Sequence, residues 1–170
     1  MKKTVTSIVL LYLVMCCCSC QAIDDAAALK QEEYVLEDGY SRYQNGVFGY
    51  SVDFPATWIC ESEAYWYATD EYEGSPDSGV MIYINSSKED YIRVYGQNGS
   101  ITTDFVVQSN YKKIDLDDNR ELYALESDEF FIAQLFFKDN KNISATISMN
   151  VQVYNEHEEE IMKLLESICY

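Results

Sequence analysis

The alternation of apolar and polar side chains near the carboxyl end of the chain constrains its fold most. Over residues 143–153 every second residue is apolar, and the residues between them are polar. This period of two places the apolar side chains on one face of a β-strand. One wet face is typical of an antiparallel sheet, because parallel strands are usually covered on both faces. The apolar positions are Ile143, Ala145, Ile147, Met149, Val151 and Val153.

A helix is predicted directly after this strand. Asn155 and Glu158 have the spacing of a capping box. Four apolar residues then follow the i, i+3, i+4, i+7 spacing of an amphipathic helix. We expect this C-terminal helix to pack on the apolar face of the sheet, which gives an α+β fold with an antiparallel sheet and flanking helices. The four residues are Ile161, Leu164, Leu165 and Ile168.

Further strands are predicted along the chain, together with a second helix over residues 103–113. Tyr50, Val52 and Phe54 alternate with polar residues, and Pro55 ends that ladder. The remaining apolar runs are bounded by turn-forming residues. The predicted strands cover residues 50–55, 80–84, 91–95, 121–125 and 130–137.

Two segments of this region resemble a known family. Residues 49–58, GYSVDFPATW, place an aromatic strand before a Pro-x-x-Trp turn, and the chain ends with a period-two strand, an acidic helix start and Leu165-Glu166-Ser167-Ile168. Both segments are similar to PsbP-like domains, including those of bacterial lipoproteins. The resemblance implies an antiparallel sheet flanked by helices that serves as a binding or assembly module. It places no functional residue of the plant members in this chain.

The first residues have the layout of a secretory signal. Lys2 and Lys3 are followed by a mainly apolar run that is too short to span a bilayer of roughly 30 Å. Cysteines follow at once and resemble a bacterial lipobox, in which a signal peptidase cuts before a cysteine that receives acyl chains such as palmitate. Ser19 supplies the small residue before Cys20, which we expect to be lipidated. Cys16, Cys17 and Cys18 are alternatives, as are an ordinary secretory peptide and a metal-binding cluster.

Charge and length limit the remaining possibilities. Cleavage before Cys20 removes 19 of 170 residues and leaves 151, enough for one domain. Loss of Lys2 and Lys3 changes the net charge from −17 to −19, which disfavours nucleic acid and anionic membrane surfaces as partners. We expect a signal peptide over residues 1–19, an acidic tether over 20–46 with a helix near 24–33, and a single domain over 47–170.

Candidate chemical groups are few. Tyr65, Trp66 and Tyr67 form an aromatic cluster among acidic residues, which suits sugar stacking or cation binding, although packing in the core is the alternative. Cys60 and Cys169 are the remaining thiols, and the sequence does not decide whether they form a disulfide.

Two other motifs are weaker. Asp115, Asp117, Asn119 and Glu126 have the spacing of a calcium loop, but Arg120 occupies the position that needs glycine, so a charged hairpin is favoured. His157 is the single histidine and has no second ligand or nucleophile in a catalytic spacing, so a structural role is favoured.

These observations predict a lipid-anchored extracytoplasmic binding or accessory protein without catalytic activity or a cofactor. Its partners would be the membrane, through the anchor, and an envelope protein or small ligand, with no nucleic acid. A carbohydrate- or cation-binding module that uses Tyr65, Trp66 and Tyr67 is the alternative. An enzyme assembled from scattered Asp, Glu and Tyr side chains is the third hypothesis.

Overall fold

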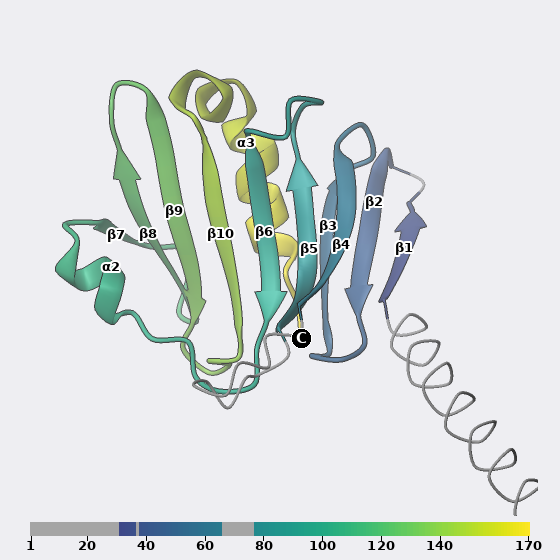
Figure 1. Cartoon of the computed structure of the whole chain (residues 1–170), viewed down its shortest axis with the longest axis horizontal. Helices are drawn as coiled ribbons and strands as arrows, with labels where there is room; N and C mark the ends of the chain where they lie inside the picture. The colour runs from purple at the N-terminus through teal and green to yellow at the C-terminus, as the bar shows by residue number, and fades with distance from the viewer. Residues whose placement is uncertain (1–30, 37, 66–76) are drawn as a thin grey trace, which may run out of the picture.

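The computed structural model describes residues 31–36, 38–65 and 77–170, which form two antiparallel sheets and two helices (Figure 1). The strands are β1 (Gln31–Val35), β2 (Tyr40–Asn45), β3 (Tyr50–Pro55), β4 (Ile59–Tyr65), β5 (Asp77–Tyr83), β6 (Tyr91–Gly96), β7 (Lys112–Asp115), β8 (Arg120–Glu126), β9 (Phe130–Phe137) and β10 (Ile143–Asn150). The helices are α2 (Asp104–Gln108) and α3 (Val151–Ser167).

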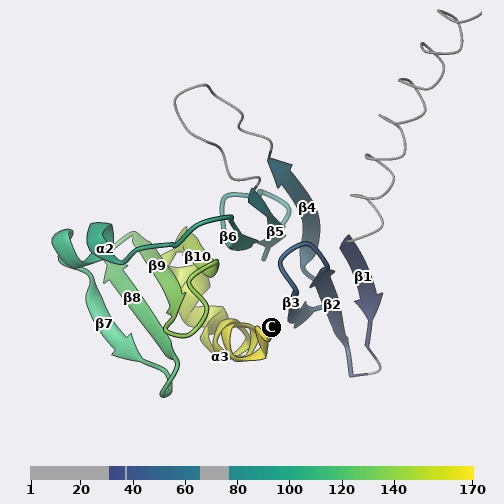
Figure 2. The ribbon, with the colours of Figure 1, turned by 90° about the horizontal axis from the view of Figure 1, so that it is seen from below.

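The larger sheet has seven strands in the order β4-β5-β6-β10-β9-β8-β7, and the smaller sheet has the order β1-β2-β3. All neighbouring strands are antiparallel. The helix α3 and the smaller sheet lie on the same side of the larger sheet, where they enclose the core (Figure 2). The α+β class and the packing of the C-terminal helix on the sheet are therefore confirmed.

The alternating strand is β10, and its apolar face is the centre of the core. Ile143, Ala145, Ile147 and Met149 are at most 1% exposed. The opposite face carries Ser144, Thr146 and Ser148, as predicted. Ser144 is also buried, and its hydroxyl donates to the carbonyl oxygen of Leu135 at 2.7 Å.

The boundary between β10 and α3 lies earlier than predicted. The side chain of Asn150 accepts a hydrogen bond from the backbone N–H of Gln152 at 2.8 Å and caps the helix. Val151 and Val153 therefore belong to the helix, and the prediction of Asn155 as the cap was wrong. The backbone leaves helical angles at His157 (φ −123°, ψ 15°), where α3 is kinked. Ile161, Leu164, Leu165 and Ile168 are buried, as predicted.

Residues 31–45 correct the predicted tether, because they form β1 and β2 of the smaller sheet. Tyr43 and Asn45 are fully buried. The amide of Asn45 donates to the hydroxyl of Tyr43 at 3.1 Å and to that of Ser78 at 3.0 Å, and the Tyr43 hydroxyl donates to the Gly79 carbonyl at 3.1 Å. Residues 31–33 of the predicted helix are part of β1; residues 24–30 lie outside the described residues.

The predicted helix over residues 103–113 is correct only for the short α2. Its Val106 packs with Tyr123 and Phe136 in a small second core. The chain turns at Asn110, which has a positive φ of 60°, and then continues as strand β7. Among the α2 side chains that the structure describes, Val106 is the buried one.

The last residues connect the two sheets. Cys169 exchanges two backbone hydrogen bonds with Ser51 of β3, at 2.8 and 3.1 Å. The hydroxyl of Tyr170 accepts from the Asn119 amide at 2.6 Å and donates to Asp139, and its ring meets Phe137 edge-to-face. The thiols of Cys60 and Cys169 are both free.

Candidate functional site

The sequence-predicted site residues lie mostly beyond the described part of the chain. Cys20, with its alternatives Cys16, Cys17 and Cys18, precedes it, and Trp66 and Tyr67 fall within the gap at residues 66–76. Tyr65 is the last residue of β4, where its backbone pairs with Asp77 of β5. The Trp66 and Tyr67 part of the predicted ligand surface therefore lies outside the described residues.

The face of the larger sheet opposite α3 and the smaller sheet carries an aromatic cluster that the sequence analysis did not single out. We call this surface the outer face; α2 covers part of it, where Val106 packs with Tyr123 and Phe136. On β6 it carries Tyr91 and Arg93, which are partly exposed, and Tyr95, which is 9% exposed, while their neighbours Ile92 and Val94 point into the core. Tyr83 of β5 lies directly across from Tyr91, and Thr146 of β10 lies across from Arg93.

Four side chains form what we call the tyrosine face: Tyr83, Tyr91, Arg93 and Tyr95. The rings of Tyr83 and Tyr91 meet edge-to-face with centroids 6.5 Å apart. The guanidinium carbon of Arg93 lies 4.5 Å from the centroid of the Tyr95 ring, within the range of a cation–π interaction. Gln134 donates to the Tyr95 hydroxyl at 3.4 Å, which fixes that ring at the sheet centre.

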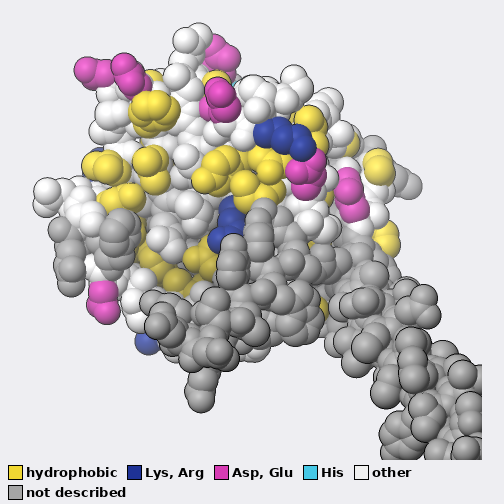
Figure 3. Space-filling model, in the orientation of Figure 1, with side chains coloured by type: hydrophobic (Ala, Val, Ile, Leu, Met, Phe, Trp, Pro, Cys, Tyr) yellow, Lys and Arg dark blue, Asp and Glu magenta, His cyan; other side chains and the backbone are white. Residues whose placement is uncertain are grey.

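Basic side chains accompany these rings although the chain as a whole is strongly acidic. The Lys88 ammonium lies 5.3 Å from the centroid of Tyr83 and pairs with Glu61, and this hydrogen bond raises the pKa of Lys88. Figure 3 shows the outer face, with hydrophobic side chains gathered over the strands and basic side chains among them. The acidic groups lie mainly around this area (Figure 3).

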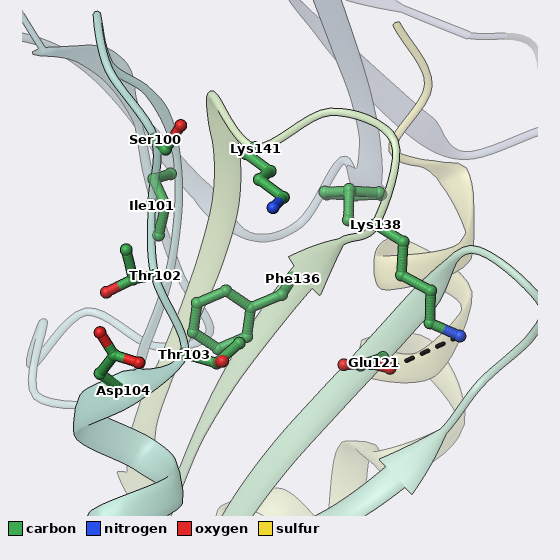
Figure 4. A pocket seen from close by; sticks show the side chains of 10 residues that line it. Ser100, Ile101, Thr102, Thr103, Asp104, Glu121, Phe136, Lys138 and Lys141 are labelled. Atoms are coloured by element: carbon green, nitrogen blue, oxygen red, sulfur yellow. Dashed lines mark ion pairs between the residues drawn. The ribbon is translucent and has the colours of Figure 1, made fainter.

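A pocket of about 470 Å³ lies on the same side of the sheet, between the loop before α2 and the β9–β10 hairpin. We call it the loop pocket. Phe136 lies at its floor, Lys141 points into it, and Thr102 and Asp104 stand on the opposite wall (Figure 4). The pocket is also lined by Ser100, Ile101, Thr103, Glu121, Phe137 and Lys138.

One carboxylate in the loop pocket is already paired. Glu121 accepts a hydrogen bond from the Lys113 ammonium at 2.8 Å and lies 3.5 Å from that of Lys138. The hydrogen bond from Lys113 lowers the pKa of Glu121. Lys138 also donates to the carbonyl of Asp118 at 3.0 Å. Because Glu121 and Lys138 are paired, they form part of the pocket wall. The charges available to a ligand are those of the other side chains that line the pocket.

The calcium-like spacing forms a charged hairpin, as favoured from the sequence. Asp115 pairs with Glu121 across β7 and β8, and the connecting turn contains Asp117. The Asp117 carboxylate accepts from the backbone N–H of Asn119 at 2.8 Å and from that of Arg120 at 2.7 Å. These bonds and the Arg120 side chain lower the pKa of Asp117. Its oxygens therefore serve the turn itself.

His157 has a structural environment at the kink of α3. Its ring packs edge-to-face on Trp58, with centroids 5.9 Å apart, and its Nδ1 lies 3.9 Å from the Glu160 carboxylate. Within residues 31–36, 38–65 and 77–170 there is no cluster of three His, Cys, Asp or Glu side chains suited to a metal. In the same ranges, no helix is both long and apolar enough to cross a membrane.

The comparisons with known proteins give no family assignment: no protein-family model matches the sequence, and no curated protein matches it. The geometry of the outer face is consequently the basis on which the function is proposed.

Proposed function

We propose that this chain is a lipid-anchored extracytoplasmic binding protein, without catalytic activity, whose tyrosine face holds a carbohydrate. The observation that carries the proposal is the cross-strand pair of Tyr83 and Tyr91 beside Arg93, on the outer face of the seven-stranded sheet. Aromatic rings stack on the apolar faces of sugar rings, while arginine and hydroxyl groups bind the sugar hydroxyls.

Binding is tested by affinity electrophoresis and thermal shift with the full chain in detergent, using neutral and uronate-containing polysaccharides as probes. We expect retardation and a raised melting temperature with at least one polysaccharide, by mass action. Tyr91→Ala should abolish both effects. Tyr40→Ala is the control, because Tyr40 is a tyrosine of the smaller sheet, where its ring centroid lies 3.8 Å from the Lys163 ammonium. Equal binding by both variants, or no binding by the wild type, would contradict the proposal.

The anchor is a separate part of the proposal and has its own test. Cells that produce the protein are labelled with an alkyne analogue of palmitate, and the label is followed on wild type and Cys20→Ser. We expect Cys20→Ser to lose the label and to leave the detergent phase. If Cys20→Ser keeps the label and a variant of Cys16, Cys17 or Cys18 loses it, that other cysteine is the lipidated one. An unlabelled wild-type protein would refute lipid anchoring.

We also propose that the domain is PsbP-like. The two segments that carry the resemblance lie against each other: the Asp53 N–H donates to the Ser167 hydroxyl at 2.8 Å, and Trp58 packs on His157 of α3. Such contact is what a shared fold would require of the opening strand and the closing helix. Superposition on a PsbP-like domain with the same strand order would support the assignment, and a different order would contradict it.

A further inference from the structure

The loop pocket contains two opposite charges that remain without partners. The Lys141 ammonium and the Asp104 carboxylate are exposed, and neither forms a hydrogen bond or ion pair with any described residue. Lys141 belongs to the β9–β10 hairpin and Asp104 begins α2, so the two groups come from separate segments. Figure 4 shows them on opposite sides of the space above Phe136. They face the same cavity without neutralising each other.

The other charges of the pocket are already paired. Glu121 lies 2.8 Å from the ammonium of Lys113 and 3.5 Å from that of Lys138, and the Lys113 ammonium also lies 3.2 Å from the carboxylate of Asp115. The charges that remain available to a ligand are therefore the Lys141 ammonium and the Asp104 carboxylate, both exposed. A ligand with one charge could pair with one of them only, whereas a ligand with both charges could pair with both.

The neutral parts of the pocket suit a small molecule with an apolar portion. The floor is Phe136, which is 6% exposed, and Ile101 packs beside it in the second small core. The hydroxyl of Thr103 makes no capping hydrogen bond to α2, so it remains available to a polar group of the ligand. A volume of about 470 Å³ lies within the range of small-molecule sites.

We propose that the loop pocket binds a small zwitterion of the α-amino-acid type, with its carboxylate at Lys141, its ammonium at Asp104 and an apolar side chain over Phe136. This site is separate from the tyrosine face, and the proposal does not depend on carbohydrate binding. It gives the protein a second ligand class on the same side of the sheet.

The first test compares four probes by isothermal titration with the full chain in detergent: L-leucine, L-phenylalanine, leucine methyl ester and N-acetyl-L-leucine. The ester lacks the carboxylate charge and the acetyl derivative lacks the ammonium. We expect saturable binding of leucine and at least tenfold weaker binding of each derivative, about the loss of one charge-assisted contact. Absence of saturable binding for both leucine and L-phenylalanine, or equal binding of all three leucine probes, would overturn the proposal.

The second test assigns each charge to its side chain. In Lys141→Gln, leucine and its ester should bind equally weakly, and in Asp104→Asn the same should hold for leucine and N-acetyl-leucine. Lys112→Gln is the control, because Lys112 is exposed on β7 and lies outside this pocket. All three positions are on the surface, so the far-ultraviolet circular dichroism should not change. Wild-type discrimination in both pocket variants would also overturn the proposal.

Discussion

The two faces of the seven-stranded sheet are built from the same strands but have opposite chemistry. The face toward α3 is lined by aliphatic residues such as Val80, Ile92 and Ile147, all at most 1% exposed. The outer face carries tyrosines, hydroxyls, an arginine and a glutamine on the alternate positions. The comparison indicates that the face toward α3 supplies most of the core, whereas the outer face adds only the small core under α2 and carries the polar side chains proposed for binding.

The largest effect should follow a change on the covered face. Ile147→Ala removes a fully buried side chain from β10 and is expected to lower the free energy of unfolding by about 3 kcal/mol. Its neighbour Thr146 points to the outer face, and Thr146→Ala should change that free energy by less than about 0.5 kcal/mol. Urea denaturation followed by circular dichroism measures both, and similar losses would contradict the proposed division of roles.

A smaller effect is expected where the outer face lacks a side chain. Gly79 lies so close to β6 that an added Cβ would be 2.4 Å from the Val94 carbonyl oxygen and 2.9 Å from the Tyr95 Cα. Both are backbone atoms, so the strands must separate. Gly79→Ala should therefore destabilise the protein by about 2 kcal/mol, with Ser148→Ala as a control on the same face. An unchanged denaturation midpoint would show that the sheet adapts.

The buried tyrosines beneath the sheet predict sensitivity to alkali. Burial raises the pKa of Tyr43 to about 12 and that of Tyr50 well above its ordinary value of 10.0. Because the folded pKa is the higher one, this contribution to stability is complete below pH 10 and is lost as pH rises through the folded pKa. Tyrosinate absorbance during alkaline titration should show cooperative unfolding above pH 10.

Tyr43→Phe separates ionisation from packing in this titration. At neutral pH the variant should be less stable than the wild type by about 1 kcal/mol, because it lacks the hydrogen bond to the Gly79 carbonyl. On alkaline titration it should nevertheless unfold at a higher pH than this loss of stability alone would predict. The same slope of stability against pH in wild type and variant would exclude Tyr43 as a source of the effect.

The smallest effect concerns the rim of the tyrosine face. Lys88→Gln breaks the pair with Glu61, but both side chains are 46% exposed, so we expect no measurable change in the denaturation midpoint. Denaturation of both proteins at low and at high salt checks this. If salt shifts the midpoint of the wild type but not that of Lys88→Gln, the ion pair does contribute to stability and the prediction is wrong.

The sequence predicted those elements whose apolar pattern is clear. β9 begins and ends where the sequence analysis placed it, and β3, β5, β6, β8 and β10 lie at the expected places. β2 was missed because the side chains that it buries are Ser41, Tyr43 and Asn45, two of which are polar. Their burial depends on hydrogen bonds to β5, which a hydropathy pattern does not reveal.

The candidate sites were less accessible to sequence reasoning. Tyr91, Arg93 and Tyr95 did give a signal, since they alternate within a predicted strand, but only strand pairing brings Tyr83 beside them. The loop pocket had no signal, because Asp104 and Lys141 are far apart in the chain and meet through the order β6-β10-β9-β8. When a site lies between two loops, its position depends on the order of the strands that these loops connect.

The bridge between Ser51 and Cys169 determines when the molecule can acquire its final form. The helix before it provides Ile161, Leu164 and Leu165 to the core, so the hydrophobic interior is incomplete until residues 161–169 have been synthesised. Nascent chains that end before α3 should consequently remain protease-sensitive.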